Sequence, residues 1–547
     1  MSYVNLLDFA PPDGDWTPAF DDAIAAALAG GYAGVLVPAS RQPYVVRQRA
    51  GAGIPRPSID LRGQQIRRFE LKGEGERSVV AMAGPGSWRL LHIGGGATDV
   101  LVKGLRLDGA QLEDADNQSH LVVVGTSATV AGGAQHVSIV DCTLSHAAGD
   151  GIAIVPASST ATGEDVDDIT IAHCRFLDSK RSGISNQRRA RRVSIVLNHF
   201  AATADQDIDL EPTGDLPESG PSDYLIFGNT MVRAPRAGVS VTLSGIRPES
   251  PSRRIAFVHN RVLGGSVGLH DAHDTSIIGN YIESGEDQQG TLLRAGGSVE
   301  RLTVTGNTVV RTAAAGPGTL LNVSAEGASH GFPRSVRIQS NHFVTRVPVP
   351  AGEALITFTN ASGILFRDNE ISSFAGQDLP IAVKFDTTGI AQRDPRGWQV
   401  VDNTFQGDAL TPPEFDQPGL GSFRVGVALS VRGPSSTDMR VSGNTFSGCP
   451  TGVRIRASSP GQLTTIPAVT GNTGAGIATE LEHVDAILVD GNQQLPGANP
   501  ATPAGARYAG PDQPDFPAPL GSLFSRTGIT PGPRLFINTP TGWSPVQ

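Results

Sequence analysis

Residues 193–200 read "VSIVLNHF", and this phrase decides the fold because it returns along most of the chain. Each copy alternates apolar and variable residues, as a half-buried β-strand does, and then reaches an asparagine. These asparagines are Asn198, Asn229, Asn260, Asn280, Asn307, Asn341, Asn369, Asn403 and Asn444. The copies lie mostly 20 to 34 residues apart, with one interval of 41 residues. A recurring period of this size is typical of repeat proteins.

A second short strand follows each phrase, as in "SGISNQ" at 182–187 and "QDIDLEP" at 206–212. Several short strands fill each period and leave no room for helices. One turn of chain per repeat, stacked at the ~4.8 Å spacing of neighbouring strands, gives a solenoid of parallel strands. An asparagine at a fixed corner of each turn can hydrogen-bond to the asparagines above and below it.

Cysteine replaces the asparagine in two upstream copies of the phrase, at Cys142 and Cys174. We expect both to be buried thiols in the same corner ladder. Because the two cysteines lie on adjacent turns of the solenoid, a disulfide between them is an alternative. The chain has only three cysteines, so a disulfide framework does not stabilise it.

Composition and charge exclude several classes of protein. The 547 residues are 39% hydrophobic and carry a formal net charge of −10, whereas a nucleic-acid surface needs a basic excess. No apolar run reaches the roughly 18 residues of a membrane helix. The start, "MSYVNLLDFAPPDGDW", has neither a basic nor an apolar leader region, so no cleavable signal peptide is predicted. The protein is then cytoplasmic, exported by another route, or released by lysis.

The two ends of the chain differ from the repeats. A helix is expected over 18–29, with Thr17 as N-cap, Pro18 as its first residue, Asp21 in its first turn and Gly30–Gly31 as its end. Residues 496–518 are rich in proline and alanine, as linkers are. The predicted organisation is a cap with the first coils at 1–60, a parallel β-helix at 61–495, the linker at 496–518 and a small β module at 519–547.

This pattern resembles the right-handed parallel β-helix proteins of the pectate-lyase-like superfamily, and within it phage tailspikes and polysaccharide depolymerases. The segment "DGDWTPAFDDAIAAALAGG" at 13–31 and the "GSLFSRT" phrase at 521–527 carry the resemblance together with the repeats. The resemblance implies an all-β fold whose helix covers the open end of the solenoid. It also implies a homotrimer, extracellular or virion-surface location, polysaccharide as partner, and contact with other virion tail proteins.

The stretch "ADQDIDLEPTG" at 204–214 places four acids on alternate residues, namely Asp205, Asp207, Asp209 and Glu211. Like charges on one face of a strand repel each other. The second strands align on their inward apolar residues, so that residues next to each other in the alignment lie on neighbouring coils. These inward residues are Ile152, Ile184, Ile208, Val239 and Leu269.

In this alignment Asp207 lies beside Gly183 and Gly151, which would leave a shallow trough that ends at His120. Asp209 lies between Ser185 and Ser240. The alignment predicts Asp207, Asp209 and Glu211 as catalytic residues. Predicted substrate-binding residues are Arg181, Gln187, Arg236, His270, His120 and Asp150.

Three interpretations of the acids remain open: a solvated surface, a calcium site, or an acid–base pair. Crowded carboxylates raise one another's pKa, as an acid catalyst requires. Carboxylates on alternate residues would lie about 6.5 to 7 Å apart, at the lower edge of the ~6.5–9.5 Å of inverting glycosidases. This spacing leans weakly towards inversion.

Other motifs narrow the choice of activity. The nucleophile-elbow, P-loop and zinc signatures do not occur, and no cofactor or metal is predicted. The motifs of polygalacturonases and alginate epimerases do not occur either, which disfavours both. The leading prediction is a tailspike-like depolymerase that hydrolyses a polysaccharide, with elimination by a lyase less favoured. The alternatives are a non-enzymatic glycan-binding adhesin or structural spike, and a bacterial glycosidase or fructan transferase. Four tryptophans and six tyrosines offer few platforms for sugar stacking, which counts modestly against a long neutral-glycan groove and leaves room for the adhesin or structural spike.

Overall fold

A computed structural model gives the fold of the chain. It describes residues 2–49, 57–83, 89–110, 119–126, 132–155, 166–187, 189–211, 220–233, 238–245, 248–325, 331–347, 349, 353–374, 379–387, 397–407, 423–431, 438–449, 451–457, 467–474, 479–482, 487–490, 493–494, 507–510, 523–526, 535–539 and 542–545. The chain divides into two compact units, Met1–Gly285 and Glu286–Gln547, which we call unit 1 and unit 2.

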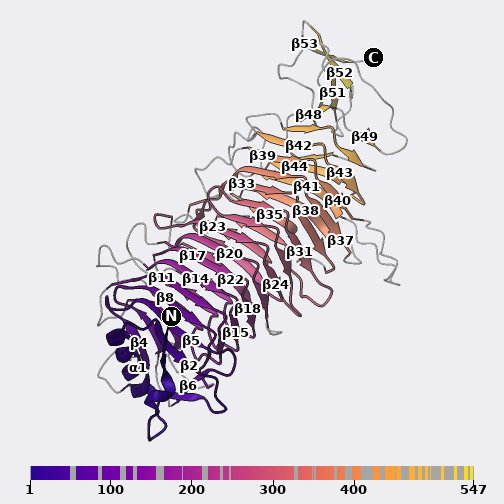
Figure 1. Cartoon of the computed structure of the whole chain (residues 1–547). Helices are drawn as coiled ribbons and strands as arrows, with labels where there is room; N and C mark the ends of the chain where they lie inside the picture. Colours follow the sequence, from indigo (N-terminus) through magenta and orange to yellow (C-terminus); the bar gives the residue numbers. More distant parts are fainter. Residues whose placement is uncertain are drawn as a thin grey trace. The chain divides into compact units, whose positions relative to one another are not determined.

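The fold is a right-handed parallel β-helix, as the sequence predicted (Figure 1). Each coil contributes one strand to each of three sheets. Sheet 1 holds the strand before the corner asparagine, sheet 2 the strand after it, and sheet 3 the second strand of the repeat.

Unit 1 has these three sheets, the single α-helix of the described residues and a short 3-10 helix, η1 (Leu6–Phe9). Sheet 1 consists of β1 (Val4–Asn5), β2 (Gly34–Val37), β5 (Arg67–Gly73), β8 (Ala97–Lys103), β11 (Ala134–Val140), β14 (Val166–Ala172), β17 (Ala190–Val196), β20 (Ser222–Phe227), β23 (Ser252–Val258), β26 (Ala272–His273) and β27 (Ser276–Ile278). Sheet 2 consists of β3 (Tyr44–Arg47), β6 (Val79–Ala83), β9 (Arg106–Asp108), β12 (Thr143–Ser145), β15 (Arg175–Leu177), β18 (His199–Ala201), β21 (Thr230–Val232), β24 (Arg261–Leu263) and β28 (Tyr281–Glu283). Sheet 3 consists of β4 (Ile59–Arg62), β7 (Arg89–Gly94), β10 (His120–Gly125), β13 (Ile152–Val155), β16 (Ile184–Asn186), β19 (Ile208–Leu210), β22 (Val239–Ser244) and β25 (Ser266–His270).

Unit 2 repeats the arrangement and adds a small group of strands near the C-terminus. Its sheet 1 holds β30 (Thr303–Thr305), β33 (Arg334–Gln339), β36 (Ser362–Arg367), β39 (Trp398–Val401), β42 (Met439–Ser442), β45 (Ala468–Thr470) and β48 (Ile487–Asp490). Its sheet 2 holds β31 (Thr308–Arg311), β34 (His342–Thr345), β37 (Glu370–Ser373), β40 (Thr404–Gln406), β43 (Thr445–Ser447), β46 (Thr473–Gly474) and β49 (Gln493–Gln494). Its sheet 3 holds β29 (Leu293–Gly296), β32 (Leu321–Ser324), β35 (Ala354–Thr359), β38 (Leu379–Asp386), β41 (Phe423–Val431), β44 (Thr451–Ala457) and β47 (Thr479–Glu482).

The last strands are β50 (Arg507–Gly510), β51 (Leu523–Arg526), β52 (Leu535–Thr539) and β53 (Gly542–Pro545). β51 pairs antiparallel with β52, and β52 pairs antiparallel with β53. β50 falls inside the segment 496–518 that the sequence suggested as a linker, and the rest of that segment lies outside the described residues.

The corner asparagines form the predicted ladders. The Asn198 side chain donates to Asn229 Oδ1 at 3.0 Å and to the Ile171 carbonyl at 2.9 Å, while its backbone N–H also donates to Asn229 Oδ1. Asn444 makes the same bonds to Asn472, a ladder member that the repeat phrase did not identify. The residue before each corner has a positive φ, for example +66° at Gly228, which glycine adopts without strain.

Cys142 and Cys174 lie in this ladder as predicted, and both are buried free thiols rather than a disulfide. The backbone N–H of Cys174 donates to Asn198 Oδ1 at 2.8 Å. A thiol therefore occupies the corner where the amide stands in later coils.

Apolar side chains that point inwards stack along each unit. In unit 1 the rings of Phe176 and Phe200 are parallel with centroids 4.6 Å apart. In unit 2 Phe358 stacks on Phe385 at 4.6 Å, and Phe405 on Phe446 at 4.8 Å. Offset stacks of this kind stabilise a core beyond the burial of their area.

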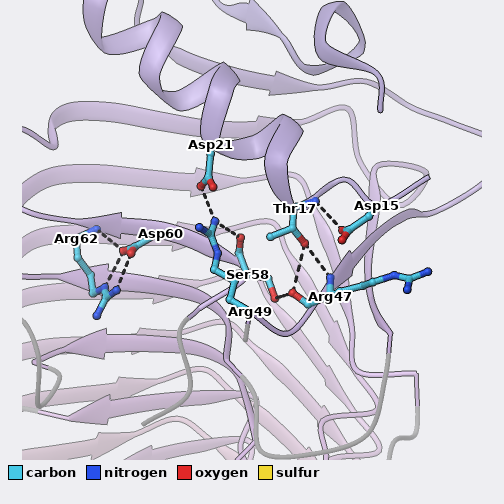
Figure 2. A network of polar contacts seen from close by, with 8 residues as sticks. All are labelled: Asp15, Thr17, Asp21, Arg47, Arg49, Ser58, Asp60 and Arg62. Carbon is cyan, nitrogen blue, oxygen red and sulfur yellow. Dashed lines mark hydrogen bonds and ion pairs between the residues drawn. The ribbon is translucent and has the colours of Figure 1, made fainter. Parts of the chain in front are cut away.

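Helix α1 (Thr17–Gly30) packs against β1 and β2 at the start of unit 1, and Gly31 ends it in the left-handed conformation. The predicted N-cap was wrong, because the helix begins at Thr17 and follows Trp16. Figure 2 shows why Thr17 does not cap the helix: its hydroxyl accepts the backbone N–H of Arg47 at 2.8 Å. The Asp21 carboxylate binds Arg49 instead of the helix start. These bonds tie the helix to the first coil. Among the described residues, no helix has the length and apolar character needed to cross a membrane.

Candidate functional site: a carboxylate cluster on sheet 3

The acids lie on sheet 3 of unit 1, where β19 runs between β16 and β22. Asp209 pairs with Ser185 on one side, as predicted, and with Thr242 on the other. The sequence alignment had placed Ser240 there and Val239 beside Ile208, which is wrong by two residues. An offset of two residues keeps the same side chains on each face of the strand, so alternation alone does not reveal it. On its other side β22 pairs with β25, and that register shifts between Val239 and Val241, which is a β-bulge.

Asp207 is fully buried and does not face solvent. Its two carboxylate oxygens accept hydrogen bonds from the hydroxyls of Thr203 and Ser240. Burial raises the pKa of Asp207, and these two hydroxyls oppose the rise. The carboxylate is satisfied inside the protein, so its role is to hold the corner before β19. The sequence missed both hydroxyl partners because one sits in the turn and the other in the bulge.

The predicted trough beside Asp207 does not exist. A Cβ added at Gly151 would lie 2.8 Å from the Phe176 ring, and one at Gly183 would lie 2.6 Å from the Phe200 ring. Both glycines therefore make room for the stacked core phenylalanines rather than for a ligand.

Asp150 forms the fully buried centre of the cluster. One oxygen accepts the backbone N–H of Ser182 at 3.0 Å, and the other accepts the Ser185 hydroxyl at 2.7 Å. His120 is also buried, with Nδ1 3.1 Å from the Asp150 backbone nitrogen and 3.2 Å from the carboxylate. The structure thus brings together His120 and Asp150, which the sequence had placed separately along the trough.

Arg181 connects the buried centre to the surface. Its guanidinium lies 3.4 Å from the Asp150 carboxylate and 3.5 Å from that of Glu211. The Arg181 side chain is 19% exposed, whereas the Glu211 side chain is 61% exposed. Glu211 is therefore the acid of this cluster that solvent reaches, and a cation holds it in place.

Asp209 lies beneath Glu211 and is only 3% exposed. Burial and the nearby charge of Glu211 raise the pKa of Asp209 to about 7, against the opposing effect of Arg181. The two carboxyl groups also share a hydrogen bond. Two carboxyl groups that share a hydrogen bond lie closer together than the expected separation of about 6.5 to 7 Å. The weak preference for inversion rested on that separation, so it is no longer supported. The longer glutamate side chain reaches back to its neighbour.

The remaining predicted residues are Gln187, His270 and Arg236. Gln187 is half-buried and lies alongside Glu211, whose backbone N–H donates to Asn186 O. His270 pairs with Ser244 at the end of β25, and its Nδ1 lies 3.0 Å from the Asp271 carboxylate. It stands two coils from Glu211 and not in the column of Asp209. Arg236 lies outside the described residues.

The cluster can hold one proton near neutral pH on a pair of carboxyl groups, one buried and one exposed. It has a cation beside the exposed member and polar side chains on the neighbouring strands. Across the described ranges, no group of three or more His, Cys, Asp and Glu side chains is arranged to hold a metal ion.

No protein-family model matches this chain, and no curated protein does. Among solved structures, it is similar to the A-module of a mannuronan C-5 epimerase from Azotobacter vinelandii, with 16% identity, a TM-score of 0.41, and coverage of 62% of this chain and 95% of that chain.

It is also similar to two tailspikes. The Dettilon tailspike protein has 16% identity and a TM-score of 0.44, with coverage of 67% of this chain and 64% of that chain. A tailspike of the E. coli bacteriophage HK620, solved with a pentasaccharide, has 13% identity and a TM-score of 0.44, with coverage of 88% and 78%. These are likenesses of fold. The strand pairing itself defines the class of this chain, a right-handed parallel β-helix.

Proposed function

We propose that this chain is a carbohydrate-active β-helix protein that hydrolyses a polysaccharide with the carboxyl pair Asp209–Glu211. The observation that carries the proposal is the hydrogen bond between a buried acid with a pKa of about 7 and an exposed glutamate. General acids work best when their pKa lies near the working pH. Crowded carboxylates that share a proton are one way to achieve that.

In the proposed reaction Glu211 meets the glycan, because Asp209 is covered. The protonated pair donates a proton through Glu211 to the glycosidic oxygen, and the bond from that oxygen to the anomeric carbon breaks. Water adds to the anomeric carbon, and its proton returns to the ionised pair. Arg181 orients Glu211 throughout, and Asp150 anchors Arg181 from below.

Asp207, His120 and Asp150 take other roles in this proposal. Their side chains are buried and make contacts within the protein, so they support the strand that carries the pair. Gln187 and His270 are the predicted substrate-binding residues that remain accessible, since both are half-buried on the same sheet.

A second candidate is a glycan-binding spike that does not cleave. The burial of Asp209 favours it, because a covered acid does not touch a glycan itself and can serve to fix the strand. For both candidates we propose polysaccharide as the partner, an extracellular or virion-surface location, and a trimer assembled with the help of the C-terminal strands.

Reducing-end release from a panel of neutral and acidic bacterial polysaccharides tests the first candidate. Glu211→Gln should abolish release, while Glu249→Gln, an exposed glutamate elsewhere in unit 1, should leave it unchanged. Release that survives Glu211→Gln would exclude the carboxyl pair. Binding of a glycan without release would favour the spike.

A further inference from the structure

A polar groove lies in unit 2, on the outer side of sheet 3. Its cavity volume is about 450 Å³, within the range of ~300–1,000 Å³ typical of small-molecule sites. Asn322, Thr357 and Lys384 form its floor from three neighbouring strands, β32, β35 and β38, on which they pair in register. Two loops, 289–291 and 317–319, form one wall.

A buried arginine fixes these two loops. Arg311 is fully buried at the inward-facing end of β31. Its guanidinium donates to the carbonyls of Gln288 and Gly316 at 2.8 Å, of Thr319 at 3.2 Å, and of Gly290. Burial lowers the pKa of Arg311 to about 10. An arginine is costly to bury, and here all four of its acceptors belong to the two loop regions beside the groove, which makes the wall a built feature.

The wall is also closely fitted. A Cβ added at Gly318 would lie 2.2 Å from Gly290 O and 2.6 Å from the Arg311 guanidinium. The loops therefore approach each other at a glycine, over the arginine that binds both. The hydroxyls of Thr291 and Thr319, one from each loop, lie 2.7 Å apart at the groove.

The polar atoms in the groove fit a hydroxyl-rich ligand. Asn322 Oδ1 is shielded from solvent and has no hydrogen-bond partner among the described residues, so it offers an acceptor to a ligand donor. Thr291, Thr319 and Thr357 add hydroxyls that both donate and accept. None of the described residues that line the groove is aromatic, so recognition rests on hydrogen bonds.

The charges in the groove do not favour an anion. Lys384 is the cation of the floor, and its ammonium lies 2.8 Å from the Asp386 carboxylate. Glu353 adds a further negative charge at the rim. An acidic sugar would meet a neutralised lysine and the carboxylate of Glu353, whereas a neutral sugar would meet hydroxyls, an amide and a carboxylate.

We propose that this groove in unit 2 is a binding site for a short neutral saccharide, recognised by Asn322, Thr357 and the two threonines of its wall. It adds a site to the proposed function and does not require that the chain cleave a glycan. Arg311 is a positioning residue for this site, since it holds the wall without facing the ligand.

The test is binding of the full chain to a printed array of neutral hexose and N-acetylhexosamine oligosaccharides, with uronic-acid oligosaccharides beside them. The strongest neutral binder is then titrated by calorimetry against four variants. Asn322→Leu and Thr357→Val each remove one polar group at similar volume and should weaken binding about 5- to 10-fold, as loss of a hydrogen bond does. Thr303→Val, on sheet 1 of the same unit, is the matched control and should bind like the native chain.

Glu211→Gln is the fourth variant, and it separates this proposal from the proposed cleavage. Binding that persists in Glu211→Gln and weakens in Asn322→Leu supports the groove, whether or not the chain releases reducing ends. The proposal is overturned if neutral oligosaccharides do not bind, if only acidic ones bind, or if Asn322→Leu and Thr357→Val bind like the native chain. Circular dichroism of each variant establishes that the fold is retained.

Discussion

The carboxyl group of Asp209 shares a hydrogen bond with that of Glu211, although Asp209 is 3% exposed and Glu211 61% exposed. This pairing joins a proton held in the interior to an acid at the surface. Burial of Asp209 is the largest cause of its raised pKa, and the charge of Glu211 is the next. The same arrangement has consequences for stability and for activity, and both depend on pH.

Stability should fall as the pH rises towards neutrality because of Asp209. Its pKa is about 7 in the folded chain, whereas an unfolded aspartate has a pKa of about 3.9. The folded state therefore holds more protons between about pH 4 and 7, and it loses stability as the pH rises through that window. Between about pH 4 and 7, the loss of unfolding free energy should be about 2–4 kcal/mol smaller in Asp209→Asn than in the native chain.

Urea denaturation at pH 4.5 and pH 7.5 measures the effect, with Glu249→Gln as the control. The native chain and the control should lose stability in parallel, and Asp209→Asn should change less. A variant that parallels the native chain would show that Asp209 titrates normally.

Arg181 should matter more to the fold than an exposed arginine does. Arg181→Met leaves the fully buried Asp150 without its cation, and breaking a buried ion pair typically costs about 3–5 kcal/mol. The Ser182 and Ser185 bonds to Asp150 remain, so we expect about 2–3 kcal/mol. Thermal unfolding of Arg181→Met beside Arg181→Lys checks this, since lysine keeps the charge. Equal stability of the native chain and Arg181→Met would contradict the anchoring role.

The asparagine ladder should be intolerant of substitution at each step. Asn229 donates to Ile195 O and Asn260 Oδ1 and accepts from Asn198. Asn229→Ala leaves these buried groups unpaired, at about 1–3 kcal/mol for each unsatisfied group. Chemical denaturation of Asn229→Ala should show a loss of about 3 kcal/mol or more, whereas Gln64→Ala at an exposed position should change little. A loss no larger than that of the control would mean that the ladder contributes nothing to stability.

Any side chain at Gly183 should destabilise the fold, because the core ring of Phe200 fills the space next to it. Gly183→Ala overpacks the core and should cost about 1–3 kcal/mol. Adding Phe200→Leu, which shortens the opposing side chain, should recover part of this loss. The comparison of single and double variants by thermal unfolding checks the account, and an open trough at Gly183 would instead leave the single variant as stable as the native chain.

Periodicity carried the prediction of the fold. Residues such as Asn198 and Asn229 mark one corner of each coil, and the spacing between them allows only short strands. The same periodicity placed Ile184 beside Ile208 and Ser185 beside Asp209 correctly. These positions follow from local alternation, which a single sequence displays.

The site depended on features that alternation does not carry. Thr242 takes the place expected for Ser240, and an offset of two residues leaves the alternation of the strand unchanged. Gly183 has no side chain, so the sequence does not show that this position faces the core ring of Phe200. The glycine therefore suggested an open trough where the core is filled. Arg311 was missed although a signal existed: it follows Val309 by two residues, and on a strand both side chains share the inward face.

The measurement that tests the central claim most directly is the pH dependence of reducing-end release from the best polysaccharide substrate, for the native chain and for Asp209→Asn. The pair should work as a proton donor, so the native rate should fall as the pH rises above about 7, where Asp209 loses its proton. Asp209→Asn should release less and lose that descending limb. A native profile with no change near pH 7, or one that Asp209→Asn reproduces, would contradict the role of the Asp209–Glu211 pair.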